Sequence, residues 1–154
     1  MDSNQNLINQ LIKDGYLKTS AVIEAFKQAD RKDFVTAEMK DRAYENTALP
    51  LMQEQTISQP LVVAFMLELL ELKSGEKILE IGTGSGWNTA LMAKIIGDTG
   101  PSASSGQRKI ISIERIEELY NFAKENLKKY SFTEKGIVDL ILGDCSKGYQ
   151  EQAP

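Results

Sequence analysis

The sequence has no histidine and only one cysteine among its 154 residues. Without histidine, Ser-His-Asp triads, histidine metal ligands and an imidazole general base are all excluded. The lone Cys145 cannot form an internal disulfide and suits a reducing cytoplasm, and only oxygen atoms remain as metal ligands. We therefore expect a cytoplasmic protein with no metal ion, whose chemistry proceeds without imidazole.

Strong charge of either sign and long hydrophobic runs are also lacking. The formal net charge is −4, with acidic and basic residues interspersed, so no basic face indicates nucleic acid as a partner. The longest apolar run, 61–72, is interrupted by Glu68 and Glu71 and is too short to span a bilayer. Residues 1–10 are polar and do not resemble a secretory leader. We expect a soluble single domain with no membrane partner.

The most informative segment is 77–86, which reads KILEIGTGSG. An apolar run leads into glycines at every second position, and a helical pattern follows at 90–95. A strand, a glycine turn and a helix together place backbone N–H groups and a helix N-terminus against a ligand. A tight turn without a ligand is the alternative. Trp87 breaks the Gly-x-Gly-x-x-Gly spacing of dinucleotide-binding proteins, so a dehydrogenase is disfavoured.

Two further strands are expected at 109–114 and 137–142, with an amphipathic helix between them that includes Leu119 and Leu127. The Ser- and Gly-rich segment 97–108 is expected to be a flexible surface loop. Because strands alternate with helices, the crossovers should be right-handed and the strands parallel. The sequence therefore predicts an α/β fold, a parallel sheet with flanking helices.

Each expected strand ends at or next to an acidic residue: Glu80, Glu114 or Asp144. In a parallel sheet these three ends lie at the same edge. Glu114 is placed to accept hydrogen bonds from both hydroxyls of a ribose. Asp144 could accept from an exocyclic amine while the amide of Cys145 donates to a ring nitrogen. An adenosine-bearing cofactor fits all three positions, and acids that merely terminate strands are the alternative.

An N-terminal helical segment, residues 1–59, precedes these elements. Helical spacing predicts helices at 7–12 and 22–29, whereas 33–50 is expected to be irregular. Pro60 should begin a third helix, because proline is favoured at the first helical position. Its apolar residues occupy most sides, so we expect this helix to be buried against the sheet.

Residues 79–86 resemble the first motif of class I S-adenosylmethionine-dependent methyltransferases. Segment 55–60, QTISQP, is more selective. Together with 112–116 (SIERI) and Gly143-Asp144, it resembles the protein-L-isoaspartate O-methyltransferase family. The resemblance covers essentially the whole chain. It implies a Rossmann-like class I methyltransferase fold, the cofactor S-adenosyl-L-methionine, and isoaspartyl-containing proteins or peptides as substrates.

The candidate cofactor-binding set is Gln55, Thr56, Ile57, Ser58, Val63, Glu80, Gly82, Gly84, Ser85, Gly86, Glu114, Asp144 and Cys145. By resemblance, the glycine turn would line the methionine part, Glu114 would hold the ribose, and Asp144 with the backbone of Cys145 would hold the adenine. Residues 55–58 would form a loop that closes over cofactor and substrate. Within that loop, Ser58 matches the active-site residue of the family.

The implied reaction agrees with the missing histidine. Its acceptor is a carboxylate, already ionised at neutral pH, and its donor is a sulfonium methyl, so no proton must be removed. Catalysis can then rest on aligning the oxygen, the methyl carbon and the sulfur, with Ser58 orienting the acceptor by a hydrogen bond. A simple helix cap is the alternative role of Ser58. The family implies that the product ester collapses to a succinimide, which makes the biological role repair of aged proteins.

The family's sheet has seven strands in the order 3-2-1-4-5-7-6, and this sequence encodes the first three. We therefore expect one truncated domain, 1–154, that lacks the C-terminal half of the sheet. Its first strand would become an edge that carries Ile78, Leu79 and Ile81, which favours self-association or pairing with another chain. Such a chain is expected to bind the cofactor weakly and to transfer little methyl.

Two other functions remain open. The chain could be a methyltransferase with another acceptor, although segment 55–60 and the lack of an Asn/Asp-Pro-Pro-Tyr motif argue against this. It could instead be a non-catalytic binding or assembly module that pairs through its sheet edge. The early stop favours the module, whereas Ser58, Glu114 and Asp144 weigh against it, because a module without cofactor has no use for them.

Overall fold

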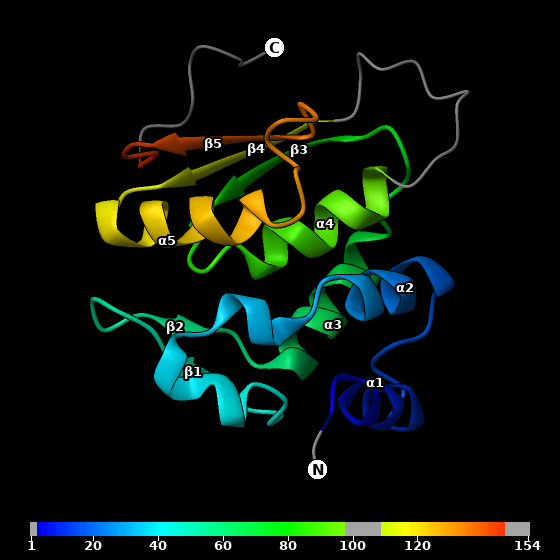
Figure 1. The fold of residues 1–154 in the computed structure, drawn as a ribbon. Helices are drawn as coiled ribbons and strands as arrows, with labels where there is room; N and C mark the ends of the chain where they lie inside the picture. The colour runs from blue at the N-terminus through cyan, green and yellow to red at the C-terminus, as the bar shows by residue number, and fades with distance from the viewer. Residues whose placement is uncertain (1–2, 98–108, 147–154) are drawn as a thin grey trace.

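A three-stranded parallel sheet forms one side of the molecule (Figure 1), in a computed structural model that describes residues 3–97 and 109–146. Its strands, in the order β3-β4-β5, are β3 (Lys77–Ile81), β4 (Lys109–Glu114) and β5 (Val138–Leu142). Ile81 lies beside Ile113, which lies beside Ile141, so the carboxyl ends meet at one edge. The predicted α/β class is confirmed. The loop expected at 97–108 falls, after Gly97, outside the described residues.

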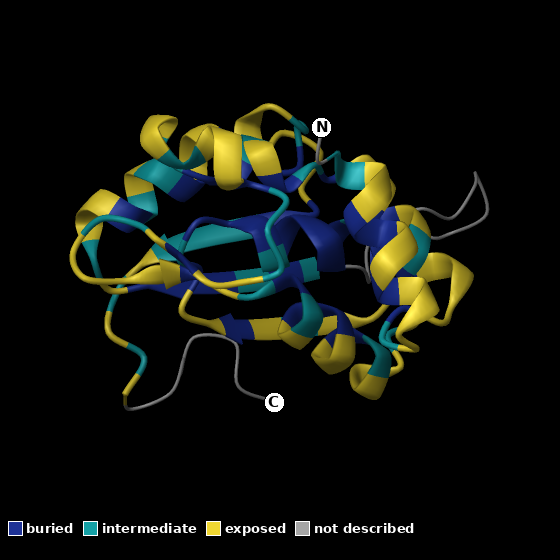
Figure 2. Ribbon diagram, turned by 90° about the horizontal axis from the view of Figure 1, so that it is seen from below, coloured by how far each residue is buried: buried dark blue, intermediate teal, exposed yellow. Residues whose placement is uncertain are grey.

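Helices α4 (Trp87–Gly97) and α5 (Glu117–Lys128) lie against one face of this sheet (Figure 1). The first follows the glycine turn directly and is buried along nearly its whole length. The second is amphipathic and buries Leu119, Ala123 and Leu127. Figure 2 shows the outcome, with buried segments in the middle of the molecule and the outer faces of the helices exposed. Both helices confirm the sequence-based prediction.

The N-terminal segment forms a second layer of helices beneath α4. It contains α1 (Asn4–Lys13), α2 (Ser20–Gln28) and two short 3-10 helices, η1 (Arg31–Phe34) and η2 (Ala37–Arg42). Phe26 of α2 packs edge-on against Trp87 of α4, with ring centroids 5.4 Å apart. The two predicted N-terminal helices are confirmed, and the region expected to be irregular, 33–50, contains the end of η1 and all of η2.

A small β-hairpin projects from this layer toward the carboxyl ends of the sheet strands. Its strands are β1 (Leu49–Pro50) and β2 (Thr56–Ile57), paired antiparallel. At the turn, Gln53 and Glu54 adopt left-handed backbone conformations with φ of 54° and 57°. Gln53 Nε2 donates to Glu118 Oε1 at 2.9 Å, so the tip of the hairpin reaches α5. The hairpin therefore spans the edge where the strands end.

Helix α3 (Pro60–Leu70) begins at Pro60 as predicted, but the expectation that it is buried against the sheet is wrong. It buries only Pro60, Val63, Ala64 and Leu67. The exposed apolar residues of α3 are Val62, Phe65, Met66, Leu69 and Leu70. A helix that is apolar all round does not specify which side faces the core. Here α2 contacts the buried side, and no described segment covers the rest.

Strand β3 lies at an edge of the sheet, as the sequence analysis predicts. Its Leu79 and Ile81 side chains are 50% and 62% exposed, whereas Ile78 is half-buried. An apolar edge strand presents unpaired backbone groups that can template pairing with another chain. Among the helices within the described ranges, none is long and apolar enough to cross a membrane.

Candidate functional site

Two cavities meet at the glycine turn that joins β3 to α4. The first, about 250 Å³, is lined by Thr56, Ile57, Ser58, Val63, Met66, Glu80, Ile81, Gly82, Thr83, Gly84, Ser85, Trp87 and Asn88. The second, about 280 Å³, is lined by Gln55, Thr56, Ile81, Gly82, Gly84, Ile113, Glu114, Arg115, Ile116, Leu119 and Cys145. The walls that both cavities share are Thr56 of the hairpin and Ile81, Gly82 and Gly84 of the turn. One elongated molecule could therefore occupy both.

The structure brings nearly all of the candidate residues into these two linings; Gly86 and Asp144 lie outside both. An alanine Cβ built at Gly86 would meet Leu127 Cγ at 3.2 Å, so this glycine faces α5. Asp144 is exposed at the end of β5, where its Oδ1 accepts from the Ser146 N–H at 2.9 Å. That hydrogen bond lowers the pKa of Asp144 below its usual value.

Glu80 is a buried carboxylate at the base of the first cavity. It accepts hydrogen bonds from Ser112 Oγ at 2.6 Å, from Asn88 Nδ2 at 2.8 Å and from the Thr89 hydroxyl. Removal from water raises its pKa, and these three donors offset part of that rise by stabilising the charged form. Glu80 thus ties the end of β3 to the first turn of α4 and to β4.

Glu114 links the glycine turn to the end of the neighbouring strand. One carboxylate oxygen accepts from the Gly84 N–H at 2.9 Å, and the other accepts from the Ile116 N–H at 3.0 Å. The side chain is only 4% exposed but still lines the second cavity. Each carboxylate oxygen has capacity for a further donor. Glu114 can therefore hold the turn in shape and bind a pair of hydroxyl groups at once.

Ser58 lies in the first cavity's wall, just before α3, and its side of the wall is held by a loop from earlier in the chain. Asn46 Oδ1 accepts from the Leu61 N–H at 3.0 Å, and the Asn46 carbonyl accepts from Gln59 Nε2 at 2.9 Å. Residue 58 is exposed, so its hydroxyl is accessible to a molecule in the cavity. The sequence motif identified Ser58 but gave no sign of this support.

Several lining residues were missed by sequence reasoning. In the first cavity they are Met66, Ile81, Thr83, Trp87 and Asn88, and in the second they are Ile81, Ile113, Arg115, Ile116 and Leu119. Those next to the glycine motif could have been found by extending it by two residues. Met66 had no such signal, because it reads as one more apolar position of a helix.

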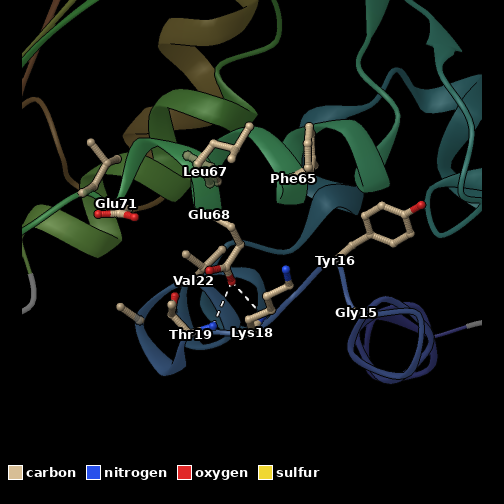
Figure 3. Close-up of a pocket in the computed structure, with 12 residues that line it drawn as sticks. Gly15, Tyr16, Lys18, Thr19, Val22, Phe65, Leu67, Glu68 and Glu71 are labelled. Carbon is tan, nitrogen blue, oxygen red and sulfur yellow. Dashed lines mark hydrogen bonds between the residues drawn. The ribbon is translucent and has the colours of Figure 1, made fainter.

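Another cavity, about 510 Å³, lies between α3 and the segment that joins α1 to α2 (Figure 3). It is larger than either cavity at the glycine turn but holds none of the candidate residues. Its carboxylate Glu68 is already engaged, because Oε1 accepts from the N–H groups of Lys18 at 2.7 Å and Thr19 at 2.9 Å. We interpret this cavity as part of the packing of α3 against the segment between α1 and α2, and not as a binding site. In the described ranges, no group of three or more acidic or cysteine side chains is placed to hold a metal ion.

Comparison with known proteins gives a consistent result. A family model described as protein-L-isoaspartate(D-aspartate) O-methyltransferase matches residues 2–154. The protein-L-isoaspartate O-methyltransferase of Ignicoccus hospitalis is 42% identical over 153 residues, which cover 99% of this chain and 67% of that protein. The Methanopyrus kandleri enzyme of the same name is 38% identical, with 99% and 63% covered. The chain thus spans about two thirds of the length of these relatives.

A solved structure supports the same fold. It is described as a protein-L-isoaspartate O-methyltransferase from Plasmodium falciparum in complex with S-adenosyl-L-homocysteine. The match has a TM-score of 0.84 at 25% identity and covers 99% of this chain and 68% of that one. The three-stranded sheet and its helices therefore correspond to part of a larger methyltransferase fold.

Proposed function

The chain belongs to the protein-L-isoaspartate(D-aspartate) O-methyltransferase family, and we propose that it binds S-adenosyl-L-methionine across the glycine turn. We further propose that it serves methyl transfer to the free carboxylate of L-isoaspartyl residues in damaged proteins. The bound S-adenosyl-L-homocysteine in the Plasmodium falciparum relative supports the choice of cofactor. In this proposal residues 1–154 form one cofactor-binding unit, with 1–59 as its helical segment, in a reducing cytoplasm.

The local geometry fits such a cofactor. A Cβ added at Gly82 or Gly84 would meet no atom within 4 Å, so the open space at the turn can accept a ligand that approaches the backbone closely. The acidic side chains in the linings are Glu80 and Glu114. With these two acidic side chains against one basic side chain, Arg115, the linings favour a cation over a diphosphate. S-adenosyl-L-methionine carries its positive charge at the sulfonium and amino groups.

We assign the two cavities to the two ends of the cofactor. The first, with Ser85 and Glu80, would hold the methionine part next to Ser58. The second, with Glu114 and Cys145, would hold the ribose and adenine. Asp144 adjoins Cys145 at the end of β5 and would reach the adenine amine at the rim. Gly86 lies outside both linings and would support this site by packing against α5.

The residues of the chain would act mainly by position. When bound, the cofactor supplies an electrophilic methyl group. Ser58 would donate its hydroxyl hydrogen to the acceptor carboxylate and so hold one oxygen in line with that methyl. Because the acceptor is already ionised, no residue has to remove a proton, and the absence of histidine is no obstacle. Alignment of this kind can supply a large part of a rate enhancement.

The observation that carries the proposal is the meeting of both cavities at Gly82 and Gly84, with Ser58 in one lining and Glu114 in the other. The test is calorimetric titration of the 154-residue chain with S-adenosyl-L-homocysteine, followed by transfer of labelled methyl to an isoaspartyl peptide. We expect measurable binding and weak transfer that the matched aspartyl peptide does not support and that Ser58→Ala reduces. Absence of any binding would overturn the assignment of the site.

The exposed apolar edge favours a second candidate, an assembly module that pairs through β3. Size-exclusion chromatography with and without S-adenosyl-L-homocysteine separates the two. A dimer whose stability does not respond to the ligand would favour the module, whereas ligand-dependent stabilisation would favour the methyltransferase.

A further inference from the structure

Arg31, the first residue of η1, is fully buried and binds four backbone carbonyl groups. Its Nη1 donates to the carbonyls of Ala43 at 2.8 Å and Glu45 at 3.1 Å. Its Nη2 donates to the carbonyls of Thr47 at 2.9 Å and Ser58 at 3.1 Å. One guanidinium group therefore joins the 43–47 loop to the residue proposed to orient the substrate.

The same guanidinium lies over the indole ring of Trp87, with Cζ 5.3 Å from the ring centroid. The Trp87 ring is fixed in turn, because Nε1 donates to the Ala29 carbonyl at 3.1 Å. Ser58 and Trp87 both line the first cavity. Arg31 thus stands directly behind two walls of that cavity, one on the hairpin side and one at the start of α4.

The positive charge of Arg31 is stabilised by carbonyl groups and is not neutralised by a direct ion pair. Burial lowers the pKa of its guanidinium to about 10, which leaves it positive at neutral pH. In the part of the chain that the structure describes, it forms no ion pair, since the neighbouring Glu45 carboxylate pairs with Arg42 instead at 2.8 Å. The Glu45 carboxylate offsets part of this charge through space. A buried cation without a direct ion pair is costly, and an acceptor carboxylate in the adjoining cavity would add further opposite charge.

We propose that Arg31 is a positioning residue of the acceptor site, which fixes the Ser58 turn against Trp87 and favours a carboxylate in the first cavity. The nature of the acceptor rests on the proposed function. The hydrogen bonds by which Arg31 joins the 43–47 loop to Ser58, which we call the clamp, do not depend on it. A purely structural role would require only that Arg31 support the fold as a whole. A positioning role requires local effects at the 43–47 loop, at Ser58 and on binding of the acceptor.

The test compares Arg31→Met, which removes both the guanidinium N–H donors and the charge, with Arg31→Lys, which keeps only the charge. Arg42→Met is the matched control, because Arg42 pairs with Glu45 at the surface of the same region. Three measurements are made on the 154-residue chain: hydrogen exchange, fluorescence of Trp87, and binding of an isoaspartyl peptide in the presence of S-adenosyl-L-homocysteine. Trp87 is the sole tryptophan of the sequence, so the emission reports on the surroundings of this one ring.

We expect Arg31→Met to speed exchange at 43–47 and 58–61, to shift the Trp87 emission, and to weaken peptide binding about tenfold or more. Affinity for S-adenosyl-L-homocysteine should change less than about threefold, because its ribose and adenine would lie in the second cavity, whose lining includes neither Ser58 nor Trp87. Arg31→Lys should recover part of the peptide binding, and Arg42→Met should resemble the wild type.

Unchanged exchange at 43–47 and 58–61 would overturn the clamp. Equal losses of both ligands, or faster exchange throughout β4 and α4, would show that Arg31 serves only the fold. If wild-type protein binds S-adenosyl-L-homocysteine but not the peptide, the proposed acceptor is wrong, while the exchange and fluorescence data still decide the clamp.

Discussion

Alanine substitutions at two glycines of the glycine turn, and at Gly75 outside it as a control, should separate the effect on packing from the effect on ligand binding. Gly86, Gly84 and Gly75 all have positive φ, at 84°, 59° and 88°. At Gly86 a new Cβ would meet Leu127 Cγ at 3.2 Å and Ala123 Cβ at 3.4 Å. At Gly84 and Gly75 it would meet nothing within 4 Å, but Gly84 lines both cavities and Gly75 lies outside them.

The expected costs follow from these contacts. Left-handed backbone costs a residue with a Cβ about 1–2 kcal/mol, so Gly75→Ala and Gly84→Ala should destabilise the fold by that amount. At Gly86 the crowding of α5 adds about 1–3 kcal/mol. Each kcal/mol corresponds to roughly 2–4 °C in melting temperature for a chain of this size. Gly86→Ala should therefore melt well below the other two variants.

The assay is urea and thermal unfolding followed by circular dichroism, with and without S-adenosyl-L-homocysteine. A ligand that binds only the folded state raises its stability according to concentration and affinity. The ligand should stabilise the wild type and Gly75→Ala similarly but should stabilise Gly84→Ala much less, since the new methyl group enters the shared wall. If Gly84→Ala bound as well as Gly75→Ala, the turn would not be the cofactor cradle. If Gly86→Ala were no less stable than Gly75→Ala, the packing argument would fail.

Three further predictions concern single side chains. Glu114→Gln loses an acceptor for one of two backbone N–H groups, so it should destabilise the fold by about 1–3 kcal/mol. It should also weaken S-adenosyl-L-homocysteine binding in calorimetry, whereas the substitution of an exposed residue, Glu117→Gln, should have neither effect. Burial and the neighbouring Asp30 raise the pKa of Tyr44 from 10.0 to about 12, so the folded state favours the protonated phenol. The stability that this phenol contributes is present below pH 10 and is lost as the pH rises from 10 to 12. Tyr44→Phe should therefore flatten that part of a plot of unfolding free energy against pH. Leu79→Lys places a charge on the exposed edge of β3 and should reduce any self-association seen by light scattering; an unchanged association constant would place the contact elsewhere.

The strands and the glycine turn could be predicted from the sequence because their signals are local. The apolar run at 78–81 is followed by glycine, and the run at 109–114 ends in an acidic residue, so each strand has a clear end in the sequence. The parallel arrangement then follows from the helices between the strands. This is why Glu80, Glu114 and Asp144 could be placed at one edge of the sheet from the sequence alone.

The hairpin could not be predicted in the same way. Its strands are two residues long, too short for an alternating pattern to be seen. Its left-handed turn residues are Gln53 and Glu54, whereas glycine or asparagine would be the usual signal. The hydrogen bond from Gln53 to Glu118 joins residues 65 positions apart. A contact at that separation holds the turn in place but has no counterpart in local periodicity.

Arg31 and Glu114 show why the support of a site is harder to read than the site itself. Glu114 follows an apolar strand, a position that marks it as a ligand candidate. Arg31 follows Asp30 and precedes Lys32 in a charged stretch, which favours a solvated surface, yet it is fully buried. Its significance comes from partners between 12 and 27 residues away. Motifs report the groups that face a ligand, whereas the groups that hold those motifs in place are determined by tertiary hydrogen bonds. Substitutions at Arg31 should therefore affect the acceptor cavity as directly as substitutions at Ser58, although the resemblance of segment 29–31 to the family gave Arg31 no role.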